Sequence, residues 1–386
     1  MNMREFGKTG VKVSPLGFGM MRLPLKNGGA AHNGTKIDDV DLDTTIKMVR
    51  EAIDNGVNYI DTAFNYVAGS SEKITAQVLA DGYREKVNLA TKLPIWMLKE
   101  EGDFDTLLNK QLERLQTDHI DFYLVHSINA NYWKRVKKYN VIEQMKKAKA
   151  DGRVKFIGFS FHDDYELFEE VINSCEWDFC QIQLNYYDQE YQAGLKGMKL
   201  AASKGMGVVV MEPLRGGFLV DVPSRVQEVF DAAPQKKTNV EWALNWCWDL
   251  PEVSLVLSGM STPEQVKQNV ALAQKAEVGM MTSQEKEVIA EAKKAFDSYN
   301  VIPCTGCNYC VEFCPNKIAI PYNIHAYNLQ YMFDDPAVAE KFYHVDVLGY
   351  GRQASACDQC ASCEAICPQH IEISSWMPQI ADRFEE

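Results

Sequence analysis

Eight of the eleven cysteines of this 386-residue chain lie in two short runs near its C-terminal end. Each run has the spacing C-x2-C-x2-C-x3-C and is followed at once by a proline. The cysteines are Cys304, Cys307, Cys310 and Cys314 in the first run and Cys357, Cys360, Cys363 and Cys367 in the second. Three closely spaced thiolates can wrap one iron–sulfur cubane from a tight loop, so this spacing predicts 4Fe-4S clusters.

The two runs resemble those of bacterial ferredoxins, in which the fourth cysteine of each run binds the other cluster. By this resemblance, one cluster is held by Cys304, Cys307, Cys310 and Cys367, and the second by Cys357, Cys360, Cys363 and Cys314. A zinc site needs four ligands and requires neither the extra C-x2-C steps nor the prolines. Disulfides would require an oxidising compartment, which nothing else in the sequence indicates.

The composition limits the classes of protein to which this chain can belong. Forty basic against fifty-three acidic residues give a net charge of −13, which disfavours a nucleic-acid binder. Hydrophobic residues make up 46% and charged residues 24%, as in globular proteins with an ample core. The sequence has no long apolar window and no apolar leader, so we expect a cytoplasmic protein without a membrane partner. Cys175, Cys180 and Cys247 lie singly among apolar neighbours, and we expect them in the core.

Polar side chains also close consecutive β-like runs in the long N-terminal part of the chain. Asp61 ends one run and Tyr66 follows it, while Lys92 and His126 end the next two runs. Such a set suits proton delivery coupled to hydride transfer, because a carbonyl that accepts hydride needs a proton donor and polarisation. We expect Tyr66 to be the donor, with Lys92 lowering the pKa of its phenol and Asp61 holding the ammonium group. His126 would orient the substrate oxygen.

The elements that must position these side chains are eight β-rich runs, each followed by helix-like sequence. The runs cover residues 15–19, 57–61, 87–91, 122–126, 156–160, 179–184, 207–211 and 253–258. Alternating strands and helices predict an α/β fold with a parallel sheet, and eight such units fit a closed (β/α)8 TIM barrel. The polar residues at the carboxyl ends of the strands would then meet at one mouth. A turn at Gly7 to Gly10 predicts a hairpin before the barrel.

The segment Asp61-Thr62-Ala63, together with Tyr66, Lys92 and His126, resembles the catalytic tetrad of the aldo-keto reductases. The resemblance covers about residues 3 to 275 and includes Leu16-Gly17-Phe18-Gly19-Met20. It implies a barrel that binds a nicotinamide cofactor, NADP or NAD, in extended form and without the glycine-rich loop of a Rossmann fold. It also implies a small-molecule carbonyl or alcohol as the substrate.

The same resemblance implies cofactor contacts on the later strands. Ser160 and Gln181 match residues that hold the carboxamide, although Phe161 replaces the family's Asn, and Met211 stands where an aromatic residue often stacks on the nicotinamide. Further contacts are implied at Pro213, Leu214 and Gly216, and in a phosphate-binding loop at Ser258, Gly259, Met260, Ser261, Gln265, Gln268 and Asn269. Gly259 and Gln265 stand where many members carry basic residues against a 2′-phosphate, so NADP and NAD both stay open.

We expect a barrel over residues 1–280, a connecting helix over 281–300 and a smaller ferredoxin-like iron–sulfur domain over 301–386. Hydride carries two electrons whereas each cluster passes one, so three interpretations stay open. The first is an NAD(P)H-dependent carbonyl reductase or alcohol dehydrogenase. In the second, a flavin or another converter links the barrel to the clusters and to a ferredoxin or similar electron-transfer partner. In the third, the barrel is a nucleotide-binding redox sensor or scaffold.

Overall fold

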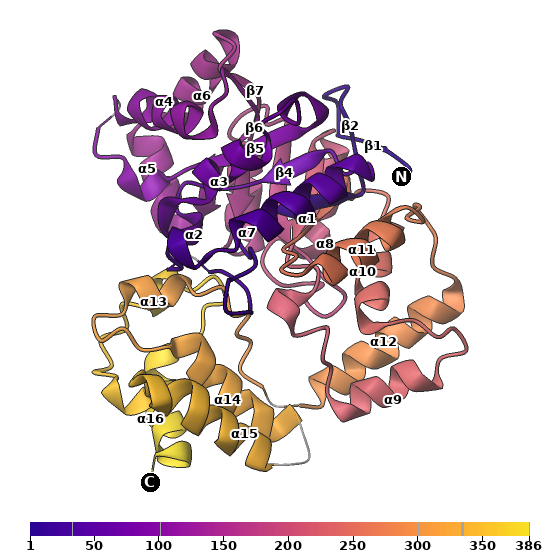
Figure 1. The fold of residues 1–386 in the computed structure, drawn as a ribbon, viewed down its shortest axis with the longest axis vertical. Helices are drawn as coiled ribbons and strands as arrows, with labels where there is room; N and C mark the ends of the chain where they lie inside the picture. The colour runs from indigo at the N-terminus through magenta and orange to yellow at the C-terminus, as the bar shows by residue number, and fades with distance from the viewer. Residues whose placement is uncertain (33, 101, 300, 333–335, 386) are drawn as a thin grey trace. The chain divides into compact units, whose positions relative to one another are not determined.

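A computed structural model describes residues 1–32, 34–100, 102–299, 301–332 and 336–385 (Figure 1). The chain divides into two compact units. The first comprises Met1–Pro213 and Leu244–Met280, and the second comprises Leu214–Ala243 and Met281–Glu386. The chain therefore passes from one unit to the other three times.

The first unit contains a closed barrel of eight parallel strands, in the order β10-β3-β4-β5-β6-β7-β8-β9. The strands are β3 (Leu16–Gly19), β4 (Tyr59–Asp61), β5 (Asn88–Leu93), β6 (Ile120–Ile128), β7 (Val154–Phe161), β8 (Phe179–Gln183), β9 (Gly207–Met211) and β10 (Leu255–Ser258). Each of the eight predicted runs forms one of these strands, which confirms the TIM-barrel fold. An antiparallel pair, β1 (Arg4–Glu5) and β2 (Lys12–Val13), forms the predicted hairpin.

Helices follow the strands, and several begin at a residue whose side chain caps the first turn. Asp41 accepts a hydrogen bond from the amide of Thr44 at 3.0 Å, and Asp164 accepts one from the amide of Leu167 at 2.9 Å. Such caps satisfy amides that have no partner within the helix. The helices are α1 (Leu42–Asp54), α2 (Tyr66–Gly69), α3 (Ser71–Val78), α4 (Asp103–Leu115), α5 (Ala130–Lys138), α6 (Val141–Ala150), α7 (Tyr165–Ile172), α8 (Gly194–Ser203), α10 (Asn239–Asp249) and α11 (Pro263–Ala273).

Aromatic side chains close the amino-terminal end of the barrel. The ring of Phe6, from the hairpin, lies 4.6 Å from that of Phe122, 5.5 Å from that of Phe179 and 6.1 Å from that of Tyr59, between centroids. These partners point inward from β6, β8 and β4 and belong to one buried cluster. Because strand side chains alternate between faces, Asp61 also points inward, two residues nearer the carboxyl end than Tyr59.

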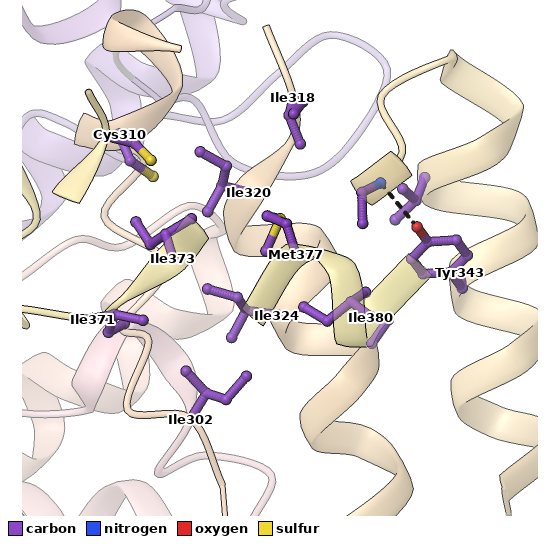
Figure 2. Packing of buried hydrophobic residues seen from close by; sticks show 14 of the residues in the cluster. Ile302, Cys310, Ile318, Ile320, Ile324, Tyr343, Ile371, Ile373, Met377 and Ile380 are labelled. Carbon is purple, nitrogen blue, oxygen red and sulfur yellow. Dashed lines mark hydrogen bonds between the residues drawn. The ribbon is translucent and has the colours of Figure 1, made fainter. Parts of the chain in front are cut away.

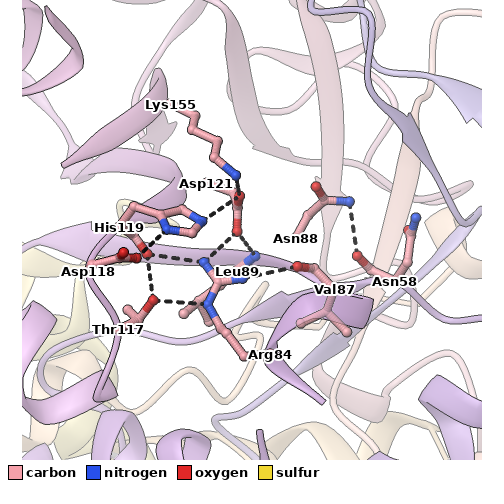
Figure 3. A network of polar contacts seen from close by, with 10 residues as sticks. All are labelled: Asn58, Arg84, Val87, Asn88, Leu89, Thr117, Asp118, His119, Asp121 and Lys155. Atoms are coloured by element: carbon pink, nitrogen blue, oxygen red, sulfur yellow. Dashed lines mark hydrogen bonds and ion pairs between the residues drawn. The ribbon is translucent and has the colours of Figure 1, made fainter. Parts of the chain in front are cut away.

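A polar network stabilises the amino-terminal side of β5 and β6 (Figure 3). One carboxylate oxygen of Asp121 pairs with Arg84 at 2.8 Å and accepts from the Leu89 amide at 2.9 Å. The other oxygen pairs with Lys155 at 2.8 Å and lies 3.5 Å from His119 Nε2. In TIM barrels the chemistry collects at the opposite, carboxyl end of the strands, so we assign this network to stability.

The second unit is built from helices around a core of its own (Figure 2). This core includes Met377 and the isoleucines at 302, 318, 320, 324, 371, 373 and 380. The hydroxyl of Tyr343 accepts a hydrogen bond from the amide of Ala354 at 3.1 Å at one side of it. The helices are α9 (Ser224–Ala232), α12 (Ser283–Asp297), α13 (Tyr309–Phe313), α14 (Ile320–Met332), α15 (Pro336–Phe342) and α16 (Ile373–Phe384).

The cysteines outside the two runs differ from one another in burial. Cys180 and Cys247 are fully buried, as predicted. The prediction of a core position is wrong for Cys175, which is only partly buried because it lies in the connection between α7 and β8 and lines a surface hollow beside Lys204. None of the helices in the described part of the chain is long and apolar enough to cross a membrane.

Candidate active site

Lys92 lies at the centre of the predicted tetrad and is fully buried in β5. Its Nζ donates hydrogen bonds to Asp61 Oδ1 at 2.6 Å and to the carbonyl oxygen of Thr62 at 2.8 Å. The same nitrogen donates to the hydroxyl oxygen of Tyr66 at 3.3 Å. The end of β4, the turn after it and β5 thus bring a carboxylate, a phenol and an ammonium group together.

The turn that presents Tyr66 has a strained backbone. Val67, Ala68 and Gly69 have positive φ angles of 53°, 46° and 81°. The left-handed region is costly for residues with a Cβ atom, above all for a β-branched one such as Val67. Strain of this kind persists only where the surrounding structure imposes it, and Val67 is fully buried.

His126 joins this group from β6. Its ring centroid lies 5.9 Å from that of Tyr66, with the planes at 78°, and 5.2 Å from that of Trp96. The register between β6 and β7 shifts directly after it, where Ser127 has a φ of 54° and its amide donates to Ser160 Oγ at 2.7 Å. A bulge at this point turns the end of the strand and so aims the imidazole. His126 Nδ1 is buried and has no hydrogen-bond partner within the described residues.

Burial controls protonation in this group. It raises the pKa of Tyr66 well above its ordinary value, and the negative charges of Asp61 and Glu212 act in the same direction. Burial of the phenol thus sets the direction of the shift, and the lowering effect expected from Lys92 stays a prediction. Burial also lowers the pKa of His126 well below its ordinary value, and the charge of Lys92 adds to this. At neutral pH the phenol keeps its proton and the imidazole is uncharged.

A second buried network fixes the strand that carries Lys92. Glu72 Oε1 accepts from the hydroxyl of Thr91 at 2.8 Å and from Gln111 Nε2 at 2.6 Å. Gln111 Nε2 also donates to the carbonyl of Lys92 at 3.0 Å, and Arg114 pairs with Glu72 at 3.1 Å. Buried polar groups need such partners to compensate for lost water. Sequence reasoning missed Glu72, Gln111 and Arg114 because they occupy ordinary helical positions on α3 and α4.

The predicted carboxamide contacts lie in the same barrel. Ser160, Gln181 and Met211 share the inward face of β7, β8 and β9. Gln181 Nε2 lies 3.6 Å from the sulfur of Met211, while Gln181 Oε1 is buried without a partner within the described ranges. Phe161, which replaces the Asn of the family pattern, faces outward and packs on Phe168 with centroids 5.1 Å apart.

The predicted phosphate loop follows β10 and opens α11. Its own side chains hold it, since Asn269 Nδ2 donates to Ser258 Oγ at 3.1 Å and the amide of Ser261 donates to Gln265 Oε1 at 2.7 Å. Thr262 caps α11 by accepting from the Gln265 amide at 3.2 Å. Of the remaining predicted positions, Met260 is buried, and the exposed ones are Gly259 and Gln268.

The predicted cofactor contacts that follow β9 are divided between the two units. Pro213 is the last residue of its segment of the first unit and is buried. Leu214 and Gly216 belong to the second unit, where Gly216 has a φ of 67° in a short turn and is exposed. Leu214 and Gly216 therefore lie outside the unit that contains Tyr66 and Lys92, whereas the other predicted cofactor contacts lie within it.

Sequence reasoning missed His162 and the buried polar side chains beside it. His162 lies two residues after Ser160, on the same inward side of the barrel, and hydrogen-bonds to the side chain of Gln192. Gln192 Nε2 donates to Gln183 Oε1 at 3.2 Å, and Gln183 Nε2 donates to Asp188 Oδ2 at 3.1 Å. All of these side chains are buried. Strand alternation continued past Ser160 is the pattern that could have found His162.

In the second unit, thiols from both cysteine runs come together. One hollow, with walls formed by residues such as Ile320 and Ile371, is lined by Cys304, Cys307, Cys310 and Cys367. Burial raises the pKa of Cys310, and the charges of the Cys307 and Cys304 thiols raise it further. The pKa of Cys357 is likewise raised by burial and by Cys314 of the other run. Within the described residues, no group of three His, Cys, Asp or Glu side chains is placed so as to hold a single metal ion.

Comparison with known proteins agrees with this geometry. The family model of the aldo/keto reductase family matches residues 15–285, and that of the 4Fe-4S dicluster domain matches residues 303–372. The chain is 28% identical to L-galactose dehydrogenase of Arabidopsis thaliana, over 76% of this chain and 96% of that protein. It is 26% identical to the NADH-specific methylglyoxal reductase of Escherichia coli strain K12, over 70% of this chain and 93% of that protein. A holo-form structure of an aldo-keto reductase from Bacillus halodurans is 25% identical, with a TM-score of 0.63, and covers 76% of this chain and 97% of that one.

Proposed function

We propose, from the premise that this chain belongs to the aldo/keto reductase family, that it reduces a small carbonyl compound with NAD(P)H or oxidises the corresponding alcohol. The observation that carries the proposal is the hydrogen bond of 3.3 Å between Lys92 and Tyr66, with Asp61 at 2.6 Å on the other side of the ammonium group. The names of two similar proteins, a methylglyoxal reductase and an L-galactose dehydrogenase, support a small oxygenated substrate.

Tyr66 is the proton donor in the proposed reaction. A reduced nicotinamide, when bound, supplies a hydride to the carbonyl carbon of the substrate. Negative charge then develops on the carbonyl oxygen, which takes the proton of the Tyr66 phenol. Lys92 stabilises the phenolate that remains, and Asp61 keeps the ammonium group in place. The uncharged imidazole of His126 donates a hydrogen bond to the same substrate oxygen.

The residues present fit a nicotinamide cofactor. Gln181 Oε1 is a buried acceptor without a partner in the described part of the chain, and a carboxamide amino group would satisfy it. The hydroxyl of Ser160 accepts from Ser127 but keeps its own hydrogen to donate. We assign the phosphates to the loop from Ser258 to Asn269, because the first amides of α11 favour an anion. The proposal covers NADH and NADPH alike.

Tyr66→Phe tests the proton donor. We expect carbonyl-dependent oxidation of NAD(P)H by the anaerobically purified protein to fall by about 100-fold or more, as for the loss of a general acid. Tyr59→Phe is the matched control, because it removes a buried phenol oxygen from the barrel core and should keep the rate. A Tyr66→Phe enzyme with the wild-type rate would contradict the assignment.

We also propose the ligand sets of the two 4Fe-4S clusters in the second unit: Cys304, Cys307, Cys310 and Cys367 for the first, and Cys314, Cys357, Cys360 and Cys363 for the second. Iron analysis should then give about eight irons per chain. A flavin band that remains in the visible spectrum after subtraction of the clusters would favour the ferredoxin-linked alternative instead. We keep 1–280, 281–300 and 301–386 as proposed domain limits and the cytoplasm as the proposed compartment, because reducing conditions preserve thiolates.

A further inference from the structure

The two cysteine runs fold in the same way. Counted from the first cysteine of each run, the third, fifth and fourteenth residues all have positive φ angles. The residues are Gly306, Asn308 and Lys317 in the first run and Gln359, Ala361 and His370 in the second, with φ between 49° and 67°. Each run therefore makes the same left-handed turns around its cysteines, and the residues at matching positions can be compared directly.

The second run makes these turns with unsuitable residues. The first run uses glycine at Gly306 and asparagine at Asn308, which are the residue types that enter the left-handed region at least cost. The second run places Gln359 and Ala361 at the same points, where the Cβ atom makes the conformation unfavourable. The loop from Cys357 to Cys363 is thus held in a conformation that its own residues disfavour.

The second run is also the more exposed. Cys360 is the exposed thiol among the eight predicted ligands, and its neighbours Asp358 and Gln359 are exposed as well. In the first run, Thr305 is buried. The hollow lined by the first ligand set has isoleucine walls, and Figure 2 shows Cys310 beside Ile320 and Ile373. Small molecules in solution can therefore reach the second ligand set more easily than the first.

We propose that the cluster held by Cys314, Cys357, Cys360 and Cys363 is the site at which small-molecule oxidants act on this protein, and that Cys360 is the ligand released first. The inference rests on the ligand sets proposed above. The oxidant is a one-electron acceptor such as ferricyanide or dioxygen. The cluster, with a core charge of 2+, gives it one electron and releases one iron(II), which breaks the bond from that iron to Cys360. A 3Fe-4S core with a charge of 1+ remains, and the freed thiolate takes up a proton. Relief of strain at Gln359 and Ala361 favours this step.

The experiment uses the full-length, anaerobically purified protein after iron analysis. Ferricyanide is added in small portions, iodoacetamide then alkylates free thiols, and peptide mapping locates the label. We expect Cys360 to be labelled about tenfold faster than Cys307, the matching cysteine of the first run, with the electron paramagnetic resonance signal of a 3Fe-4S core appearing in parallel. Equal labelling of the two runs, or earlier labelling of the first, would overturn the proposal.

Matched variants test the role of the backbone. The pair Gln359→Gly and Ala361→Gly should slow labelling of Cys360 about threefold, because glycine removes the strain. The pair Gly306→Ala and Asn308→Ala places the same strain in the first run and should speed labelling of Cys307. Peptide mapping of the wild-type protein stands by itself if a variant fails to fold. An initial iron content near four per chain would overturn the two-cluster assignment and this proposal together, whereas equal labelling of an eight-iron protein would overturn this proposal alone.

Discussion

The backbone amide of Ser127 donates a hydrogen bond of 2.7 Å to the hydroxyl of Ser160, across the pair β6 and β7. Ser127 directly follows His126 and has a φ of 54°, so this bond holds the bulge that aims the imidazole. Ser160 therefore has a structural task in addition to the cofactor contact that the sequence predicts.

Ser160→Ala should lower both stability and catalysis. It leaves a buried amide without an acceptor, which costs about 1–3 kcal/mol of unfolding free energy. It also frees His126 to move, and we expect kcat for carbonyl reduction to fall on the order of tenfold, equivalent to ~1.4 kcal/mol. Ser254→Ala is the control, because Ser254 Oγ likewise accepts from a buried amide, that of Val208, at 3.3 Å. It should lose stability but keep kcat, and an equal loss of kcat in both variants would contradict the role of the bulge.

Ala68→Gly should stabilise the protein. Ala68 is exposed and has a φ of 46° in the turn after Tyr66, so glycine removes about 1 kcal/mol of strain and almost no packing. The matched change Ala271→Gly, at an exposed position inside α11, should destabilise by about 1 kcal/mol, because glycine weakens an ordinary helix. Denaturant unfolding of the two variants measures both effects. If both variants changed the free energy of unfolding in the same direction, the turn after Tyr66 would not be strained.

His162→Gln should make stability less sensitive to acid. Burial lowers the pKa of His162 to about 4, against the hydrogen bond with Gln192, whereas the unfolded chain binds the proton near pH 6.5. Above pH 6.5 His162 is uncharged in both the folded and the unfolded chain, so it does not reduce the free energy of unfolding. As the pH drops from 6.5 towards 4, only the unfolded chain binds the proton, and the free energy of unfolding falls. Between pH 7.5 and pH 5 the wild type should lose about 2 kcal/mol more than the variant, measured by urea unfolding at each pH. An equal loss of unfolding free energy in the wild type and the variant would contradict the lowered pKa of His162.

Asp121→Asn should destabilise the barrel strongly. The variant leaves Arg84 and Lys155 without their shared carboxylate, and breaking a buried ion pair in this way costs about 3 kcal/mol. Asp118→Asn is the control, because Asp118 also contacts His119, at 2.6 Å, but its side chain is 93% exposed. Asp118→Asn should lower the free energy of unfolding by less than about 0.5 kcal/mol in the same unfolding experiment. Similar losses for the two variants would mean that the network acts through His119 rather than through burial.

The barrel and the grouping of the four proposed catalytic side chains could be predicted because their determinants are local. Each strand is a short β-rich run, and a parallel barrel necessarily brings the ends of these runs to one mouth. Asp61, Lys92 and His126 therefore needed only a strand assignment to be placed together. Tyr66 needed in addition the short distance along the chain from Asp61.

The remaining features depend on contacts that no local pattern carries. The bulge at Ser127 is a property of the register between β6 and β7, and register is set by packing across the whole sheet. The raised pKa of Tyr66 reflects how deeply the phenol is buried, which the spacing of residues does not give. The position of Leu214–Ala243 in the second unit rests on partners such as Phe296 that lie far along the chain.

This last arrangement has a consequence for how such a chain can be divided into stable fragments. Phe218 stacks near Phe296 with centroids 5.4 Å apart, Lys237 pairs with Glu285 at 2.6 Å, and the amide of Arg225 donates to the hydroxyl of Tyr299 at 3.2 Å. A stop codon after residue 280 would remove every one of these later partners. Because each unit is built from two separate segments of the chain, one cut at residue 280 would leave Leu214–Ala243 joined to the first unit and without these partners.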